Sequence, residues 1–209
     1  MKETEDIIDL IRYGATLKRV NRTGWGLAGV DCIRTESVAE HTYGSVLACV
    51  VLSQYLIETG FQLDVEKVLK MAVIHDLPES LTSDIPRTPD LSVTSTLSEM
   101  KRMLDREAIQ KIFNKETSMS KHFLSLWEEY EQNSTLEAKI VRGSDVIDML
   151  MHALNLEDSG VSPRIMHPFF TTSQEIIRSL EIDILSEIFL ILLNRHQQNV
   201  NVTNIQHNI

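Results

Sequence analysis

The chain has 209 residues, 43% of them apolar, and a formal net charge of −10 from 20 basic and 30 acidic residues. This length suits one hydrophobic core, and the acidic balance argues against a groove for a nucleic acid polymer or for an anionic membrane surface. No apolar run approaches the roughly 20 residues of a membrane span, and the acidic first residues differ from the basic start of a signal peptide. We therefore expect a cytoplasmic protein with no membrane partner. Its two cysteines, Cys32 and Cys49, have no CxxC spacing, which favours buried free thiols over a disulfide or a thiolate metal site.

The first half of the chain is dominated by helical periodicity. Gly and Pro are scarce, and apolar residues recur mostly three and four positions apart, so an all-α fold in a single compact helical bundle is predicted. A first helix is expected from Thr4 to Leu17, followed by a basic, glycine-containing loop that reaches Gly29. Ser37 and Glu40 have the spacing of a capping box, so the next helix begins there and runs to about Gly60.

That second helix places His41 in its first turns. Small residues follow His41 on the same face, beginning with Gly44, and would allow another helix to approach closely. Asp64 can cap a third helix, and counting along its apolar stripe puts His75 and Asp76 on or beside the buried face. Pro78 disfavours helical geometry at the residue before it and interrupts the helix directly after the pair.

The second half predicts further helices with short connections. After a turn-rich connection from Thr82 to Ser92, we expect helices from Leu97 to Phe113, from Ser118 to Tyr130, from a capping box at Ser134 and Glu137 to about Leu156, and from about Ser173 to Leu193. A loop is expected between Asp158 and Thr172, and residues 194–209 are expected to be a flexible tail after a domain of residues 1–193. Asp145 lies within an apolar stripe between Val141 and Met149, on a helix that is apolar on two sides and so should be central.

Four ionisable residues thus lie on the apolar sides of three predicted helices: His41, His75, Asp76 and Asp145. Burying such groups without partners is costly, and one divalent cation would satisfy all four. Two imidazoles and two carboxylates suit Mn, Co, Fe, Mg or Zn and leave coordination positions open for water and substrate. The alternative is that the histidines are ordinary core residues and the aspartates pair with arginines such as Arg142 or Arg34.

The ordered motifs resemble those of a known family. They are ESVAEH at 36–41, HD with PE after it at 75–79, SDIP at 83–86, LKRVNRTGW at 17–25, LWEEYE at 126–131 and the late Asp145. Together they resemble the HD-domain metal-dependent phosphohydrolases, and within them the small 5'-deoxynucleotidases of the YfbR-like and HD-domain-containing protein 2 group. The resemblance implies a helical HD-domain bundle, usually a homodimer, that hydrolyses deoxynucleoside 5'-monophosphates to nucleoside and phosphate.

The resemblance also implies roles for individual residues. His41, His75, Asp76 and Asp145 would bind one divalent metal ion, Glu79 would match the catalytic glutamate, Asp84 the aspartate that works beside it near the sugar, and Arg22 the arginine that holds the phosphate. The chain departs from the family pattern at two places. Ser83 stands where Gly is frequent, and Thr23 with Gly24 separates Arg22 from Trp25, whereas in bacterial members a tryptophan directly follows the arginine. Trp25 is interpreted either as a substrate-binding residue at the sugar or as a core anchor.

The residue types suit these roles on chemical grounds. A metal ion lowers the pKa of a bound water, Glu79 lies just past the proline break where it can move a proton to the leaving 5'-oxygen, and the guanidinium of Arg22 matches two phosphate oxygens. The simpler interpretations are a solvated basic loop for Arg22 and a favourable carboxylate at a helix start for Glu79.

Two other functions stay open. One is hydrolysis of another nucleotide, such as a triphosphate, a cyclic nucleotide or guanosine tetraphosphate. The other is a non-catalytic, metal-stabilised helical dimer.

Overall fold

Helices form almost all of the regular structure in the computed structural model, which describes residues 2–31, 34–85, 91–114 and 116–206. In chain order they are α1 (Lys2–Thr16), the 3-10 helix η1 (Leu17–Arg19), α2 (Thr23–Leu27), α3 (Val38–Glu58), α4 (Val65–Ile74), α5 (Glu79–Thr82), α6 (Leu91–Ile112), α7 (Ser118–Gln132), α8 (Leu136–Asp158), α9 (Pro163–Leu180) and α10 (Asp183–Gln206). No strand occurs in these ranges, so the predicted all-α class is confirmed.

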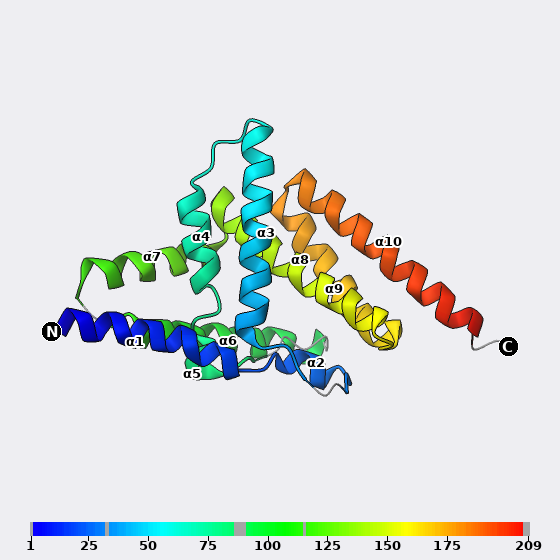
Figure 1. Cartoon of the computed structure of the whole chain (residues 1–209), viewed down its shortest axis with the longest axis horizontal. Coiled ribbons are helices and arrows are strands. Elements are labelled where there is room, and N and C mark those ends of the chain that lie inside the picture. Colours follow the sequence, from blue (N-terminus) through cyan, green and yellow to red (C-terminus); the bar gives the residue numbers. More distant parts are fainter. Residues whose placement is uncertain (1, 32–33, 86–90, 115, 207–209) are drawn as a thin grey trace.

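Helices α3 and α8 form the centre of the molecule (Figure 1). Helix α8 packs against α3, α4 and α7 and also against α9 and α10, which is why its sequence is apolar on two sides. Ile140 and Leu150, both on α8, are fully buried. None of the described helices is long and apolar enough to cross a membrane.

Several helix starts follow from local sequence. The capping box is present: Ser37 Oγ accepts a hydrogen bond from the Glu40 amide at 3.2 Å, and Glu40 Oε2 accepts one from the Ser37 amide at 2.8 Å. Asp64 caps α4 by accepting from the Lys67 amide at 3.0 Å. The capping box predicted at Ser134 is wrong, because Thr135 takes the N-cap position and accepts from the Ala138 amide.

The region after α8 differs most from the prediction. A loop was expected up to Thr172, but α9 begins at Pro163, where a proline at the first helical position costs no hydrogen bond. Pro168 lies inside α9, and the neighbouring Phe170 is fully buried. The single helix predicted from Ser173 to Leu193 is instead divided by Glu181, whose φ of 57° ends α9 in the left-handed conformation.

Helix α10 continues to Gln206, so the predicted helix end at Leu193 is wrong. Buried polar contacts hold this extension. His196 is fully buried with Nδ1 2.5 Å from Glu157 Oε1, and Asn199 donates to Glu157 Oε2 at 2.7 Å. The flexibility predicted for residues 194–209 stays a prediction, and residues 207–209 lie outside the described residues.

Two further expectations concern short segments. Helix α6 begins at Leu91, earlier than the predicted Leu97, and the turn-rich residues 86–90 lie outside the described residues. Cys49 is buried and carries a free thiol, as expected, whereas Cys32 also lies outside the described residues.

Candidate metal and phosphate site

The His75 and Asp76 pair lies in the turn between two helices. Helix α4 ends at Ile74, two residues earlier than the sequence predicts, and α5 begins at Glu79, directly after Pro78. The turn is closed by bonds from the Leu77 amide to the Ile74 carbonyl and from the Glu79 amide to the Asp76 carbonyl, each 3.0 Å. The proline break therefore places an imidazole and two carboxylates within five residues.

His41 and Asp145 are brought to this turn by the packing of α3 against α8. His41 is fully buried, and its Nε2 lies 2.9 Å from Asp145 Oδ1. Asp76 Oδ2 lies 3.2 Å from His75 Nε2 and 3.8 Å from His41 Nε2. Ligand atoms from His41, His75 and Asp145 all lie within 4.8 Å of one another. The structure thus brings the four sequence-predicted residues into one cluster.

Two buried atoms in this cluster have unused hydrogen-bonding capacity. His75 Nδ1 lies 2.7 Å from the Ala72 carbonyl, to which it can donate, so Nε2 is the ring nitrogen that remains for a metal ion. Neither His75 Nε2 nor Asp76 Oδ2 has a hydrogen-bond partner among the described residues. Buried polar atoms without a hydrogen bond are costly, and two imidazoles with two carboxylates form a donor set that suits a divalent cation.

Asp148 is a member of the site that the sequence analysis missed. Its Oδ2 lies 2.8 Å from His41 Nδ1, so it accepts the Nδ1 proton and turns Nε2 toward the cluster. Gly44 makes room for this carboxylate, because a Cβ at residue 44 would lie 1.8 Å from Asp148 Oδ1. A sequence signal exists, since Asp148 follows Asp145 by three residues on the same helix.

The carboxylates strongly perturb the two imidazoles. Burial lowers the pKa of His41, but its hydrogen bonds to Asp145 and Asp148 outweigh burial and raise the pKa to about 10. Burial likewise lowers the pKa of His75, and the neighbouring Asp76 charge reverses the direction and raises it. Without a cation, these carboxylates thus favour the protonated imidazoles, and a bound metal would have to displace the protons.

Glu79 lies beside the cluster with its two oxygens in different environments. Lys101, on α6, donates to Glu79 Oε1 at 2.9 Å and also lies 3.3 Å from Asp105. Glu79 Oε2 is buried and has no hydrogen-bond partner among the described residues. Burial, with the charge of Asp76, raises the pKa of Glu79 to about 8, while Lys101 opposes the rise. Nothing in the local sequence pattern singles out Lys101, because it reaches Glu79 from another helix.

Arg22 faces the same cluster from the segment before α2. Its amide donates to the Glu36 carbonyl at 2.8 Å, and an isolated antiparallel bridge joins Asn21 to Ser37 at the start of α3. Arg22 Nη1 lies 3.7 Å from Asp76 Oδ2, and its side chain is 16% exposed. Arg22 is therefore held against the cluster, in contrast to the simpler interpretation of a solvated loop.

Asp84 follows α5 and is buried. It lies close enough to Arg22 and Glu79 to raise the pKa of each through its charge, alongside the larger effects of burial and of Asp76. Ser83 precedes it with φ 61° and ψ 168°, a backbone region that suits glycine. The glycine-to-serine departure noted in the sequence thus falls on a residue with strained geometry.

Trp25 lies in the core. The residue is 3% exposed, and its ring packs against Phe169 and His152. Its indole N–H donates a hydrogen bond to Glu36 Oε2 at 2.9 Å. Of the two interpretations, this position favours the core anchor over contact with a sugar.

Of the two arginines considered as partners for the aspartates, Arg142 lies near Asp145 and Arg34 pairs with another residue. Arg142 Nη1 lies 3.8 Å from Asp145 Oδ2 and its guanidinium packs 4.2 Å from the centre of the Tyr130 ring. Arg34 instead pairs with Glu40. Asp145 therefore has a cation near one oxygen while its other oxygen faces His41.

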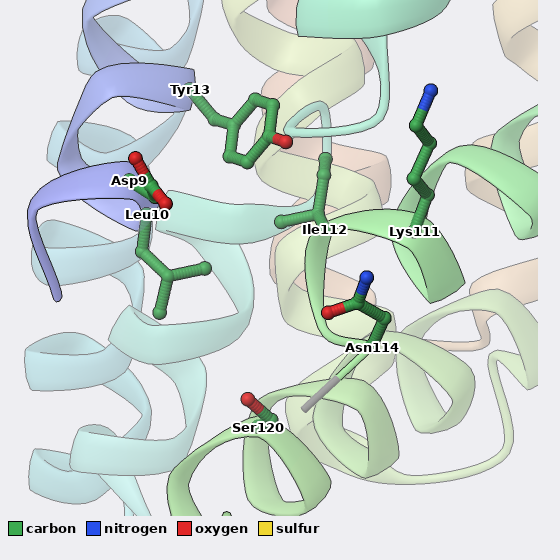
Figure 2. Close-up of a pocket in the computed structure, with 7 residues that line it drawn as sticks. All are labelled: Asp9, Leu10, Tyr13, Lys111, Ile112, Asn114 and Ser120. Carbon is green, nitrogen blue, oxygen red and sulfur yellow. The ribbon is translucent and has the colours of Figure 1, made fainter. Parts of the chain in front are cut away.

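A separate cavity of about 150 Å³ lies between α1 and the end of α6 (Figure 2). Tyr13, Asp9 and Leu10 line one side, and Lys111, Ile112, Asn114 and Ser120 line the other. None of these residues belongs to the cluster, and the cavity is smaller than the roughly 300 Å³ that a small-molecule site usually offers. This cavity is therefore not the candidate functional site, which is identified instead from the clustered His and Asp side chains.

Comparison with known proteins agrees with this geometry. The family model described as "HD domain" matches residues 14–183, which include the whole cluster. The chain belongs to the HD domain family. A 5'-deoxynucleotidase HDDC2 from Dictyostelium discoideum is 34% identical over 153 residues, covering 72% of this chain and 77% of that protein. The human 5'-deoxynucleotidase HDDC2 is 29% identical over 168 residues, covering 80% of this chain and 76% of that protein.

A solved structure shares this fold. A conserved hypothetical protein from Pyrococcus furiosus has a TM-score of 0.74 and 32% identity, and the match covers 90% of this chain and 99% of that one.

Proposed function

We propose that this HD domain protein is a metal-dependent phosphoric monoester hydrolase that converts deoxynucleoside 5'-monophosphates to nucleoside and phosphate. The observation that carries the proposal is the buried cluster in which His75 Nε2 and Asp76 Oδ2 have no hydrogen-bond partner among the described residues, with His41 and Asp145 beside them. The similarity to proteins named 5'-deoxynucleotidase supports the choice of substrate.

In this proposal His41, His75, Asp76 and Asp145 hold one divalent ion, which is Mn, Co, Fe, Mg or Zn. The side chains of Asp76 and Asp145 are 18% and 22% exposed, so the cluster is accessible on its carboxylate side. When bound, such an ion supplies Lewis acidity toward a water molecule and a phosphate oxygen.

Arg22 binds the phosphate of the substrate. Its guanidinium presents parallel N–H groups that match two phosphate oxygens, and in a chain of net charge −10 it offsets the repulsion between the carboxylates and an anionic substrate. The Nη1 atom already lies 3.7 Å from Asp76, so a phosphate bound there lies next to the metal ligands.

Glu79 moves the proton. Lys101 holds Oε1, and the unpartnered Oε2 is left to take a proton from the attacking water and to deliver one to the 5'-oxygen as the bond from phosphorus to that oxygen breaks. Burial and Asp76 raise the pKa of Glu79 to about 8 in the metal-free protein, and a bound cation beside it would lower this pKa, which favours the carboxylate form that accepts a proton. Asp84 assists beside it near the sugar.

We also propose a cytoplasmic homodimer. Helix α3 presents an exposed apolar stripe at four-residue spacing, formed by Tyr43, Leu47, Val51 and Tyr55, and such a face suits a helix from a second copy of the chain. The buried free thiol of Cys49 fits a reducing compartment.

The direct test is phosphate release from deoxynucleoside and ribonucleoside 5'-monophosphates by protein loaded with each candidate metal. Asp145→Asn should abolish phosphate release, because it removes a carboxylate ligand with little change in shape. Asp158→Asn is the matched control, since Asp158 lies at the end of the same helix and pairs with Arg195 at the surface. Equal activity in the two variants would contradict the proposal.

A further inference from the structure

Thr23 and Asp84 join two segments that are far apart in the sequence. The Thr23 amide lies 2.6 Å from Asp84 Oδ2, and the Thr23 hydroxyl lies 2.6 Å from the Asp84 carbonyl and 3.1 Å from Oδ2. A hydroxyl has one proton to donate, and the shorter distance assigns it to the carbonyl. The amide then serves the carboxylate, so a single residue holds both the main chain and the side chain of Asp84.

These contacts hold a strained loop. Ser83 has φ 61° and ψ 168°, a strained backbone conformation that a serine keeps only where surrounding contacts hold it. The Ser83 amide bonds to the Glu79 carbonyl at 3.0 Å on one side of the strained residue. The Thr23 bonds to Asp84 hold the chain on its other side, so the direction in which Asp84 leaves the strained residue depends on Thr23.

The two joined segments carry different parts of the proposed machinery. Arg22 directly precedes Thr23, and Asp84 follows the helix that begins at Glu79. With Oδ2 engaged by the Thr23 amide, Oδ1 is the oxygen of Asp84 that is left for a substrate group. Asp84 is 9% exposed, so a small shift of its loop changes whether that oxygen can be reached.

We propose that Thr23 is a positioning residue, which fixes Asp84 relative to the phosphate-binding Arg22. This inference rests on the proposed function. Arg22 has its own anchor, the 2.8 Å bond from its amide to the Glu36 carbonyl, so phosphate binding does not depend on the Thr23 hydroxyl. Loss of the hydroxyl therefore acts on the chemical step through Asp84 and leaves substrate binding largely intact.

The test compares Thr23→Val with Thr23→Ser in steady-state phosphate release from a deoxynucleoside 5'-monophosphate. Valine keeps the branched shape and the amide but lacks the hydroxyl, and serine restores it. Thr23→Val should lower kcat about tenfold with KM changed less than twofold, as expected for one hydrogen bond expressed in the transition state. Thr23→Ser should recover most of the loss.

Thr59→Val is the matched control, because the Thr59 hydroxyl also donates to a backbone carbonyl, that of Leu56 at 2.9 Å, at the far end of α3. A kcat for Thr23→Val within twofold of wild type, or an equal loss in Thr23→Ser, would overturn the proposal. If the wild-type protein releases phosphate from no nucleotide, the proposed function has failed. The contacts of Thr23 with Asp84 are then tested by amide hydrogen exchange at residue 23. Exchange should be at least tenfold faster in Thr23→Val than in the wild type, and an unchanged rate would show that the Thr23 hydroxyl does not hold Asp84.

Discussion

Replacement of Gly44 by alanine tests whether Asp148 orients His41. A Cβ at residue 44 would lie 1.8 Å from Asp148 Oδ1 and 2.5 Å from its Cγ, so the carboxylate must turn away and lose its 2.8 Å contact with His41 Nδ1. A hydrogen bond that involves a charged group contributes about 1.5–3 kcal/mol. At about 2–4 °C per kcal/mol for a chain of this length, the loss corresponds to a fall in melting temperature of about 3–12 °C.

Metal affinity should fall about 10- to 100-fold in Gly44→Ala, because His41 is no longer held with its Nε2 lone pair toward the cluster. Isothermal titration calorimetry of the metal-free protein with Mn²⁺ measures this directly. Gly143→Ala is the control: its Cβ would lie 2.4 Å from Leu185 Cδ1, and its three nearest atoms all belong to Leu185, so it overpacks α8 and lowers stability at a different contact. If Gly44→Ala binds Mn²⁺ as tightly as Gly143→Ala does, the role assigned to Asp148 is wrong.

Further predictions concern single side chains and protons. Asp148→Asn should weaken Mn²⁺ binding about 10-fold or more in the same titration, and an unchanged affinity would contradict it. Metal binding to the wild-type protein should release protons, because the imidazoles, whose pKa values are raised, must lose a proton to coordinate the metal. Titration in buffers of different ionisation enthalpy measures the number of protons released. A value of zero would refute the coupling between metal binding and deprotonation. Glu79 has a pKa of about 8 in the folded metal-free protein against an ordinary 4.5, so its contribution to stability is complete below pH 4.5 and is lost as the pH rises through 8. As the pH rises from 4.5 to 8, the free energy of unfolding of metal-free Glu79→Gln, measured with urea, should therefore increase relative to that of the wild type. A difference that stays constant with pH would disprove the raised pKa of Glu79. Ser83→Gly should raise the stability by about 1 kcal/mol, since relief of strain exceeds the added entropy of the unfolded chain, and a loss of stability would show that Ser83 is not strained.

The part of the site that local sequence could predict lies within single helices and their ends. His75, Asp76 and Glu79 are placed by a helix stripe and a proline, and both can be read from the chain itself. His41 follows from the capping box at Ser37. These features depend on neighbours within a few residues, which is why their local positions agree with the structure.

The missed residues act across helices. Asp148 is directed at His41 only because α3 and α8 pack together, with Gly44 allowing the close approach. Lys101 reaches Glu79 from α6, and its partner cannot be identified from spacing along its own helix.

The same reason explains the errors near the C-terminus. Pro168 and the polar residues after Leu193 led to the prediction of a loop before Ser173 and a flexible tail after Leu193. The burial of Phe170 and the contact of His196 with Glu157 favour helix there, and both depend on tertiary packing.

The central claim is that the His and Asp cluster holds a metal ion that serves phosphate hydrolysis. The most direct measurement is phosphate release from dAMP by one preparation assayed metal-free, after reloading with Mn²⁺, and after the same reloading of Asp76→Asn. Release is expected only from the reloaded wild-type protein. Equal release from the metal-free protein or from reloaded Asp76→Asn would contradict it.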